Sequence, residues 1–589
     1  EVPSIAIIPF DNKGDKEDEF YAYSISSELI SDVTSAGLIR VAGLKDIEKL
    51  EYQTLNYNEL SEKLLVRYIA QGTLWKVDSV FQLSMELYDS KTSKVLWSES
   101  WQKAWNELTT IKGNLAENIL NKLKVSTKQD FTKAPTSNTE AYEYYLRAEY
   151  IYEKRENMKD TEIARGLLRK AIELDDNLIL AKTDLGYTYY ETSDYDKAII
   201  IFEEASNQAK IINDMKGLAY SLDAIGSLNV AVGDINKAIE YYDSALKIRE
   251  ELGDNQGIAN SLNNIGNIYL RKDDLDNALN LFTRALEIQN KLGYKEGIAQ
   301  SLSKIGHVYN WRSSWDKSLE YYNRSLKIYE EIDDKHGIEM TLYNIGQIYS
   351  MKGDDSMALD FYFRNLEISE DLGNRNMMGY HLMNIGGVYG SKGDYDKGLE
   401  YFTKAQNILK EVGDMYGMGF SQQSIIGYNI KKGDYEKSLD LHIPTLKIFE
   451  EMDAKSLVAS TLAQIGVYYY YKDLYKKASE YLVKSLTISN NIETEVYTLL
   501  STTTYLSLSK RKLNIKYNRE KLIQLINKTE IYEFKINYYL YQLLEDTSYL
   551  ETAYNQVKEK ADNLEPNVAA KFLSYPIPKA IVEEWEKIK

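Results

Sequence analysis

A glycine that recurs at a fixed 40-residue step constrains this chain more than any other feature of its sequence. It stands inside segments of helical periodicity, as in residues 257–292, where Ile258, Leu262 and Ile265 fall on one helix face. Glycine within a helix costs roughly 1 kcal/mol relative to alanine, so its recurrence predicts that another element approaches too closely for a side chain. The step is occupied by Gly186, Gly226, Gly266, Gly306, Gly346, Gly386 and Gly466, and it is broken where Ile426 precedes Gly427.

A second apolar stripe of helical period follows each glycine-containing segment. In the same unit it consists of Ala278, Phe282 and Ala285, after a polar turn. Each helix is apolar on one side only, so a single pair cannot bury itself and must stack on its neighbours. Aspartates at the turns are expected to cap the second helices; they are Asp234, Asp354, Asp394 and Asp434. The pattern predicts a helical solenoid.

The repeated pattern L-x-N-I-G-x-x-Y, followed by G-D-Y-x-K-A and a small residue two turns on, resembles the tetratricopeptide repeat (TPR). The usual unit has about 34 residues, so a 40-residue step adds roughly one helical turn. The resemblance implies a mostly α fold, a right-handed α-solenoid of helical hairpins. We expect nine TPR units over 139–490, in regular phase from about 177, two degenerate hairpins over 491–564, and a C-terminal cap over 565–589.

The first 125 residues have a different pattern, with short apolar or alternating runs that predict strands at 3–10, 38–44, 66–77, 80–89 and 94–102. Helical spacing at 20–37 and 107–123 predicts a small α/β domain. It resembles the TolB-like amino-terminal domain that bacteria fuse to TPR arrays, through Ile5-Ala6-Ile7-Ile8-Pro9-Phe10, Glu28-Leu29-Ile30, Val66-Arg67-Tyr68-Ile69-Ala70-Gln71-Gly72, Glu86-Leu87-Tyr88-Asp89 and Leu96-Trp97-Ser98-Glu99. Residues 126–138 are polar and are predicted to be a linker.

Repeat eight is irregular, because Ile426 replaces the glycine and Pro444 falls inside the second helix. Proline removes a backbone hydrogen bond and is expected to bend or break a helix. Two interpretations remain open: sequence drift at a tolerant position, or a bend that shapes the inner surface.

The composition narrows the classes of function. The 71 basic and 89 acidic residues give a net charge of −18, which disfavours nucleic-acid binding. The chain has no cysteine, so disulfides and thiolate metal sites are excluded. No apolar run is long enough to enter a membrane. The chain begins with Glu1, so we expect a mature form or part of a longer chain, with a leader or membrane anchor able to precede it.

The motifs of the common enzyme classes are missing. There are four histidines and no H-E-x-x-H pattern, and neither a phosphate-binding loop nor a nucleophile elbow occurs. The chain is therefore predicted to be non-enzymatic, without catalytic or metal-binding residues and without a cofactor.

The remaining candidate for a functional site is the inner surface, which the first helix of each pair lines in TPR arrays. Asparagine amides both donate and accept, so a ladder of them can pair with the backbone of an extended peptide, and exposed aromatic rings can anchor its side chains. The predicted peptide-binding residues are Asn260, Asn263, Asn264, Asn267, Arg271, His307, Asn310, Trp311, Tyr343, Asn344, Gln347, Tyr380 and Asn384. In the alternative interpretation, Asn264, Asn344 and Asn384 belong to the helix-to-helix bonding of the repeat itself.

We therefore expect a protein- or peptide-binding scaffold of a bacterial signalling or cell-envelope system, with the envelope favoured over the cytoplasm. Two alternatives stay open. The chain can be the regulatory region of a longer adenylate cyclase, since the resemblance implies that such layouts carry a cyclase, kinase or winged-helix domain in front. It can also be a structural assembly scaffold without a peptide ligand.

Overall fold

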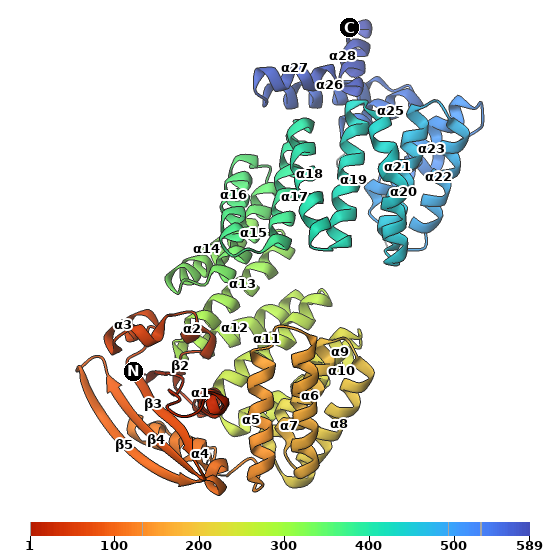
Figure 1. The fold of residues 1–589 in the computed structure, drawn as a ribbon. Coiled ribbons are helices and arrows are strands. Elements are labelled where there is room, and N and C mark those ends of the chain that lie inside the picture. The colour runs from red at the N-terminus through yellow and green to blue at the C-terminus, as the bar shows by residue number, and fades with distance from the viewer. Residues whose placement is uncertain (1, 132, 493, 530–532) are drawn as a thin grey trace. The chain divides into compact units, whose positions relative to one another are not determined.

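The structure is a computed structural model that describes residues 2–131, 133–492, 494–529 and 533–589. It divides into two compact units, one ending at Ile338 and one beginning at Glu339, and each is described by itself. The expected fold class is confirmed, because the chain is a mostly helical solenoid of TPR-type hairpins with a small sheet domain at its N-terminal end (Figure 1).

The sheet is open and has the strand order β2-β1-β3-β4-β5. Its first two strands run parallel to their neighbours, whereas β3, β4 and β5 form an antiparallel meander. The predicted strand at 38–44 is reduced to two residues. The strands are β1 (Ser4–Ile7), β2 (Arg40–Val41), β3 (Tyr68–Val77), β4 (Val80–Asp89) and β5 (Lys94–Ala104), and the helices of this region are α1 (Glu19–Ser35), α2 (Leu44–Glu48), α3 (Tyr57–Lys63) and α4 (Leu108–Leu123).

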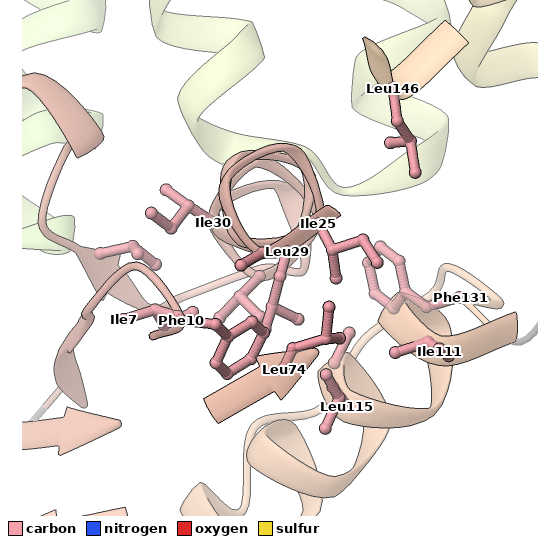
Figure 2. Packing of buried hydrophobic residues seen from close by; sticks show 14 of the residues in the cluster. Ile7, Phe10, Ile25, Leu29, Ile30, Leu74, Ile111, Leu115, Phe131 and Leu146 are labelled. Atoms are coloured by element: carbon pink, nitrogen blue, oxygen red, sulfur yellow. The ribbon is translucent and has the colours of Figure 1, made fainter. Parts of the chain in front are cut away.

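Helix α1 joins the sheet domain to the repeats, because its side chains are buried on nearly all sides. Ile25 and Leu29 are fully buried, and Figure 2 shows them between the sheet residue Leu74 and Leu146 of the first repeat helix. Phe131, in the segment predicted to be a linker, belongs to the same cluster. The sheet domain and the first repeats therefore share one hydrophobic core.

The repeats are successive antiparallel hairpins. In the first unit they are formed by α5 (Thr139–Glu153), α6 (Met158–Leu174), α7 (Ile179–Glu191), α8 (Tyr195–Ile212), α9 (Met215–Ala231), α10 (Ile235–Leu252), α11 (Asn255–Arg271), α12 (Leu275–Leu292), α13 (Lys295–Trp311) and α14 (Trp315–Glu331). Helix α15 (Lys335–Met351) spans the boundary between the units. The second unit continues with α16 (Asp355–Asp371), α17 (Arg375–Lys392), α18 (Tyr395–Glu411), α19 (Met415–Lys432), α20 (Tyr435–Glu451), α21 (Lys455–Tyr471) and α22 (Tyr475–Ser489).

Three of the four predicted aspartate caps are present. The carboxylates of Asp234, Asp354 and Asp394 accept hydrogen bonds from backbone amides three residues on, at 3.3, 3.1 and 3.2 Å. The side chain of Asp434 makes no such bond at the start of α20.

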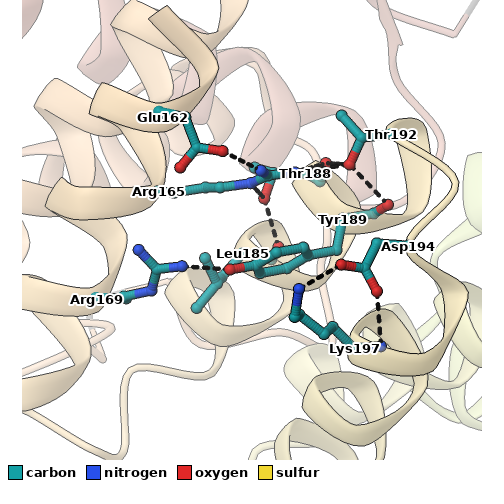
Figure 3. A network of polar contacts seen from close by, with 9 residues as sticks. All are labelled: Glu162, Arg165, Arg169, Leu185, Thr188, Tyr189, Thr192, Asp194 and Lys197. Atoms are coloured by element: carbon teal, nitrogen blue, oxygen red, sulfur yellow. Dashed lines mark hydrogen bonds and ion pairs between the residues drawn. The ribbon is translucent and has the colours of Figure 1, made fainter. Parts of the chain in front are cut away.

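A buried arginine connects the first two hairpins (Figure 3). Arg165 of α6 is 5% exposed, and it donates to the Thr188 hydroxyl at 3.0 Å and to the Thr188 carbonyl at 2.7 Å. It also donates to the Thr192 hydroxyl at 2.7 Å, and its guanidinium lies 4.1 Å from the centre of the Tyr189 ring. The planar guanidinium of Arg165 on α6 thus donates hydrogen bonds to acceptors in the last turn of the neighbouring helix α7.

Each repeat glycine lies against a large side chain sixteen residues further along. A Cβ atom at these positions would come within 3.1 Å of that side chain. The pairs are Gly186–Phe202, Gly226–Tyr242, Gly266–Phe282, Gly306–Tyr322, Gly346–Tyr362, Gly386–Phe402 and Gly466–Leu482. The predicted close approach is therefore made chiefly by side chains of the second helix, and most of these are aromatic rings.

Repeat eight does not contain the predicted break. Pro444 lies inside one continuous helix, α20, so of the two expected effects, a bend or a break, the break does not occur. At the position of the missing glycine, Ile426 is fully buried, and the residue sixteen on is His442 rather than Phe or Tyr. In repeat eight the larger side chain of Ile426 at the glycine position is thus accompanied by the smaller ring of His442 sixteen residues further along.

Among the described residues after α22, six helices of irregular length follow: α23 (Val496–Lys512), α24 (Arg519–Ile526), α25 (Phe534–Leu544), α26 (Thr547–Asp562), α27 (Pro566–Ser574) and α28 (Pro576–Ile588). Phe572 and Ile581, which the sequence assigns to a cap, are fully buried. They pack in a cluster with Val557 of α26 and with Tyr395 of repeat seven. The tail therefore folds back on an earlier repeat and does not lie only over the last hairpin.

Candidate binding surfaces

The predicted peptide-binding residues fall into both units. Asn260, Asn263, Asn264, Asn267 and Arg271 lie on α11, and His307, Asn310 and Trp311 lie on α13, all in the first unit. Tyr343 to Gln347 on α15 and Tyr380 and Asn384 on α17 lie in the second unit. The structure thus provides two candidate surfaces, each described within its own unit.

On α11, the apolar stripe of Leu262 and Ile265 is buried, which leaves Asn260 and Arg271 exposed and Asn264 half-buried. Asn263 is only 6% exposed, and its Oδ1 atom accepts no hydrogen bond from any described residue. A buried amide oxygen without a donor costs about 1–3 kcal/mol, and because this atom has almost no accessible surface, an incoming N–H group reaches it only if neighbouring side chains move.

A lysine missed by the sequence analysis joins the two helices of this surface. Lys304 of α13 donates from Nζ to the Asn267 Oδ1 atom at 3.1 Å. Its pKa is lowered because it is largely buried. Lys304 lies two residues before Gly306, the position that Asn264, Asn344 and Asn384 hold in their own repeats, but the prediction followed the asparagines at this position and therefore did not include a lysine.

The end of α13 presents an aromatic pair. Trp311 is 52% exposed and donates from Nε1 to the His307 Nε2 atom at 3.2 Å. Burial, and secondarily Lys304, lowers the pKa of His307, which is consistent with a neutral ring that accepts this bond. Asn310 beside them is half-buried, and its Oδ1 atom accepts no hydrogen bond from the described residues.

In the second unit, the predicted residues bond chiefly to one another. Gln347 donates to the Tyr343 hydroxyl at 2.7 Å, and Tyr343 is also hydrogen-bonded to Asn384 of the next first helix. Tyr380 donates to Asp414 at 2.8 Å, and Asn344 is half-buried. The bond between Tyr343 and Asn384 is of the helix-to-helix kind.

A cavity of about 570 Å³ lies at the inner side of the first three repeats, where the sequence analysis placed no site. Helices α1 and α4 of the sheet domain bound it on one side, and the first helices α5, α7 and α9 bound it on the other. In the sequence, this cavity could have been indicated only by Asp184 and Tyr220, which lie on the first helices of repeats two and three. Carboxylates outnumber bases in the lining: Glu28, Asp32, Glu149, Glu153, Asp184, Glu191 and Asp254 stand against Lys112, Lys216 and Arg249.

The charges in this cavity are only partly matched. Lys112 lies 3.2 Å from Glu28 and 3.5 Å from Asp32, and Asp32 also pairs with Lys216. Glu149 and Asp184 form no ion pair with the described residues. Burial, and then the charge of Glu28, raises the pKa of Glu149 well above its usual range, and burial raises the pKa of Asp184 to about 6.

Among the described residues, no three His, Cys, Asp or Glu side chains gather as a metal ion requires. Among the helices formed by the same residues, none combines the length and apolarity needed to cross a lipid bilayer.

Family models match parts of the repeat region. Residues 217–291 and 297–371 match one tetratricopeptide repeat model, and residues 181–209 and 382–408 match a second model of the same description.

Comparison with known proteins finds one curated relative. "Putative adenylate cyclase 3" of Rhizobium meliloti (strain 1021) is 24% identical over 188 residues, which cover 31% of this chain and 32% of the relative. The match thus spans about a third of the relative's length.

Two solved structures are similar in fold. A STAND protein with a tetratricopeptide repeat sensor from Pyrococcus horikoshii has a TM-score of 0.46 at 16% identity, over 61% of this chain and 54% of that one. Aspartyl phosphate phosphatase F from Bacillus subtilis has a TM-score of 0.42 at 14% identity, over 62% of this chain and 96% of that one. The matches to the tetratricopeptide repeat models are confined to residues 181–209, 217–291, 297–371 and 382–408.

Proposed function

We propose that this chain is a non-enzymatic scaffold that binds an extended peptide or protein segment on the first-helix face of its repeats. The observation that carries the proposal is Trp311, whose ring is 52% exposed at the end of α13. Tryptophan is costly to expose, and it dominates binding energy when a partner covers it. We define Asn260, Asn263, Asn267, Lys304, His307 and Trp311 as the α11–α13 surface.

The polar groups of this surface suit a peptide backbone. Exposed Asn260 offers both a donor and an acceptor, while the unpartnered Asn263 oxygen would accept a backbone N–H only after neighbouring side chains move aside. Trp311 would supply the apolar anchor for a side chain of the peptide. The surface around it is polar rather than strongly charged, which favours binding of peptide backbone and apolar side chains over binding of a phosphate group.

The test uses the full chain as bait in lysate of its source organism, with captured proteins quantified by mass spectrometry. We compare the parent with Trp311→Ala combined with Asn260→Ala. The control is Ile200→Ala, which removes an equally exposed apolar side chain, 56% exposed, from the second helix α8. A protein lost only from the α11–α13 variant supports the proposal. Equal capture by all three chains would contradict it and would favour an assembly scaffold that does not use this surface.

A second candidate is the regulatory region of a longer adenylate cyclase. Its support is the 24% identity to a protein named as a cyclase, together with the TolB-like pattern of residues 3–125. In this proposal the sheet domain and repeats receive a signal that a catalytic domain converts into product. Sequencing the gene upstream of Glu1 tests it, because an encoded cyclase or membrane segment would favour this candidate and an adjacent start codon would exclude it.

A further inference from the structure

The cavity between the sheet domain and the first repeats carries an inference that is independent of the α11–α13 surface. Its central feature is a carboxylate without a donor. Glu149 accepts a 3.2 Å hydrogen bond at Oε1 from the Ser27 hydroxyl of α1, whereas its Oε2 atom is buried and accepts none from any described residue. A buried carboxylate oxygen left without a donor is unfavourable, so the site favours a ligand that donates.

Asp184 supplies a second carboxylate to the same cavity. It accepts a 2.9 Å hydrogen bond from the Tyr220 hydroxyl, and a second bond comes from Tyr145. These are neutral donors, so the charge of Asp184 is not compensated. The bases of the lining are already used, because Lys112 and Lys216 pair with Asp32 and Arg249 pairs with Asp223.

The walls around these carboxylates are aromatic. Tyr145, Tyr152, Tyr187 and Tyr220 line the cavity, and the rings of Tyr187 and Tyr220 lie 5.5 Å apart. Tyrosine faces attract organic cations, particularly where water is excluded. A volume of about 570 Å³ lies within the range of small-molecule sites and is far larger than a metal ion requires.

We propose that this cavity binds a small organic cation, an alkylammonium compound with more than one amino group, whose ammonium groups pair with Glu149 and Asp184 between the tyrosine rings. Because Ser27 and Glu28 of α1 line the cavity together with Glu149 and Asp184 of the repeats, the bound cation would lie between the sheet domain and the array. The excess of carboxylates in the lining also disfavours anionic ligands. The site lies on different helices from the α11–α13 surface.

The experiment is isothermal titration of the full chain with 1,4-diaminobutane at pH 7.5 in phosphate, a buffer without an amine. We expect saturable binding by the parent chain. Glu149→Gln and Asp184→Asn should each weaken it at least about tenfold, since each removes one charge-assisted hydrogen bond and keeps the side-chain shape. Glu203→Gln, the same change at an exposed position of α8 outside the cavity, should leave the affinity unchanged.

Three comparison ligands define the chemistry. 1,4-Butanediol has the same length without charge, and equal affinity for it would overturn the assignment. If millimolar Mg²⁺ abolishes the calorimetric signal of diamine binding, the site would be assigned to an inorganic cation instead. Tighter binding of N-acetyl-lysinamide than of the diamine would identify a lysine side chain of a partner as the source of the ammonium group. No saturable binding by the parent would also overturn the proposal.

Unfolding is checked independently, because a variant that fails to fold also fails to bind. Asp184→Asn removes a buried, uncompensated charge, and Glu149→Gln replaces a buried carboxyl group by a neutral amide of the same shape, so we expect their thermal midpoints at pH 7.5 to equal or exceed that of the parent. Loss of binding together with a retained midpoint supports the site, and retained binding in the folded variants contradicts it. The Trp311→Ala and Asn260→Ala variant serves as a second control and should bind the diamine like the parent.

Discussion

Phe282 lies directly against Gly266, so that a Cβ atom on the glycine would come within 2.5 Å of the Phe282 Cε1 atom. The two residues belong to the first and second helices of one hairpin, and the same relationship recurs through the array. It explains why a residue that disfavours helix is retained inside a helix: the aromatic ring occupies the volume of the missing side chain.

The first prediction concerns this contact. Gly266→Ala should lower stability by about 1–3 kcal/mol, because overpacking against Phe282 outweighs the gain in helix propensity. The matched control is Gly166→Ala in α6, where no atom lies within 4 Å of the added Cβ, so that substitution should stabilise by roughly 0.4–1 kcal/mol. Thermal unfolding followed by circular dichroism compares the two. A rise in midpoint for both variants would show that the ring adjusts without cost.

The second prediction concerns Arg165. Arg165→Met keeps the aliphatic volume but removes the donors to Thr188 and Thr192, so we expect a loss of about 2–4 kcal/mol. Lys197→Met removes an ion pair with Asp194 in which the lysine is 62% exposed, and it should change stability by less than about 1 kcal/mol. Urea unfolding of the two variants measures the difference. Equal midpoints would mean that the network in Figure 3 contributes little.

The third prediction is a pH dependence. The pKa of Asp184 is raised to about 6, whereas an unfolded aspartate ionises near about 4. Between these values the folded chain holds more protons than the unfolded chain, so stability falls as the pH rises through this window and stays lower above it. Asp184→Asn keeps an acceptor for Tyr220 and should be more stable than the parent by about 1–2 kcal/mol at pH 8, with little difference near pH 4.

Thermal midpoints of parent and Asp184→Asn at both pH values check this prediction, with Glu203→Gln as a variant that should show no such pH dependence. A difference between parent and Asp184→Asn of the same size at pH 4 and pH 8 would contradict it, because it would then not arise from ionisation.

The fourth prediction concerns the tail. Phe572 is fully buried and its ring centre lies 5.9 Å from that of Phe534 and 6.4 Å from that of Tyr395. Phe572→Ala should cost about 3–5 kcal/mol locally and release α27 and α28. Hydrogen exchange should then accelerate in these two helices. Phe420→Ala, at a ring 37% exposed on α19, is the control and should leave exchange in the tail unchanged.

Much of the fold follows from local patterns. The 40-residue period, the apolar stripes and the aspartate caps depend on nearest-neighbour packing, so the hairpins and three of the four expected caps could be predicted from the sequence. Pro444 shows the limit of that approach, because α20 continues through it. Packing against neighbouring helices supplies most helical stability and can compensate for one missing backbone hydrogen bond.

The candidate surfaces were predictable only where they follow the repeat. The sequence proposed Asn263, Asn267 and Trp311 from their repeat positions, but it did not propose Lys304, whose Nζ atom donates to Asn267. The cavity was missed because its carboxylates come from segments far apart in the sequence, with Ser27 and Glu149 more than a hundred residues from each other. No periodicity connects them.

The sequence by itself determined that this protein is an array of helical hairpins with a sheet domain in front, because helix and strand periods and the repeat length are local properties of the chain. The tertiary structure decided that α1 packs against the first repeats, that both regions share one core, and that uncompensated carboxylates meet in a cavity between them. These features depend on long-range burial, in which side chains from distant segments lose their water together.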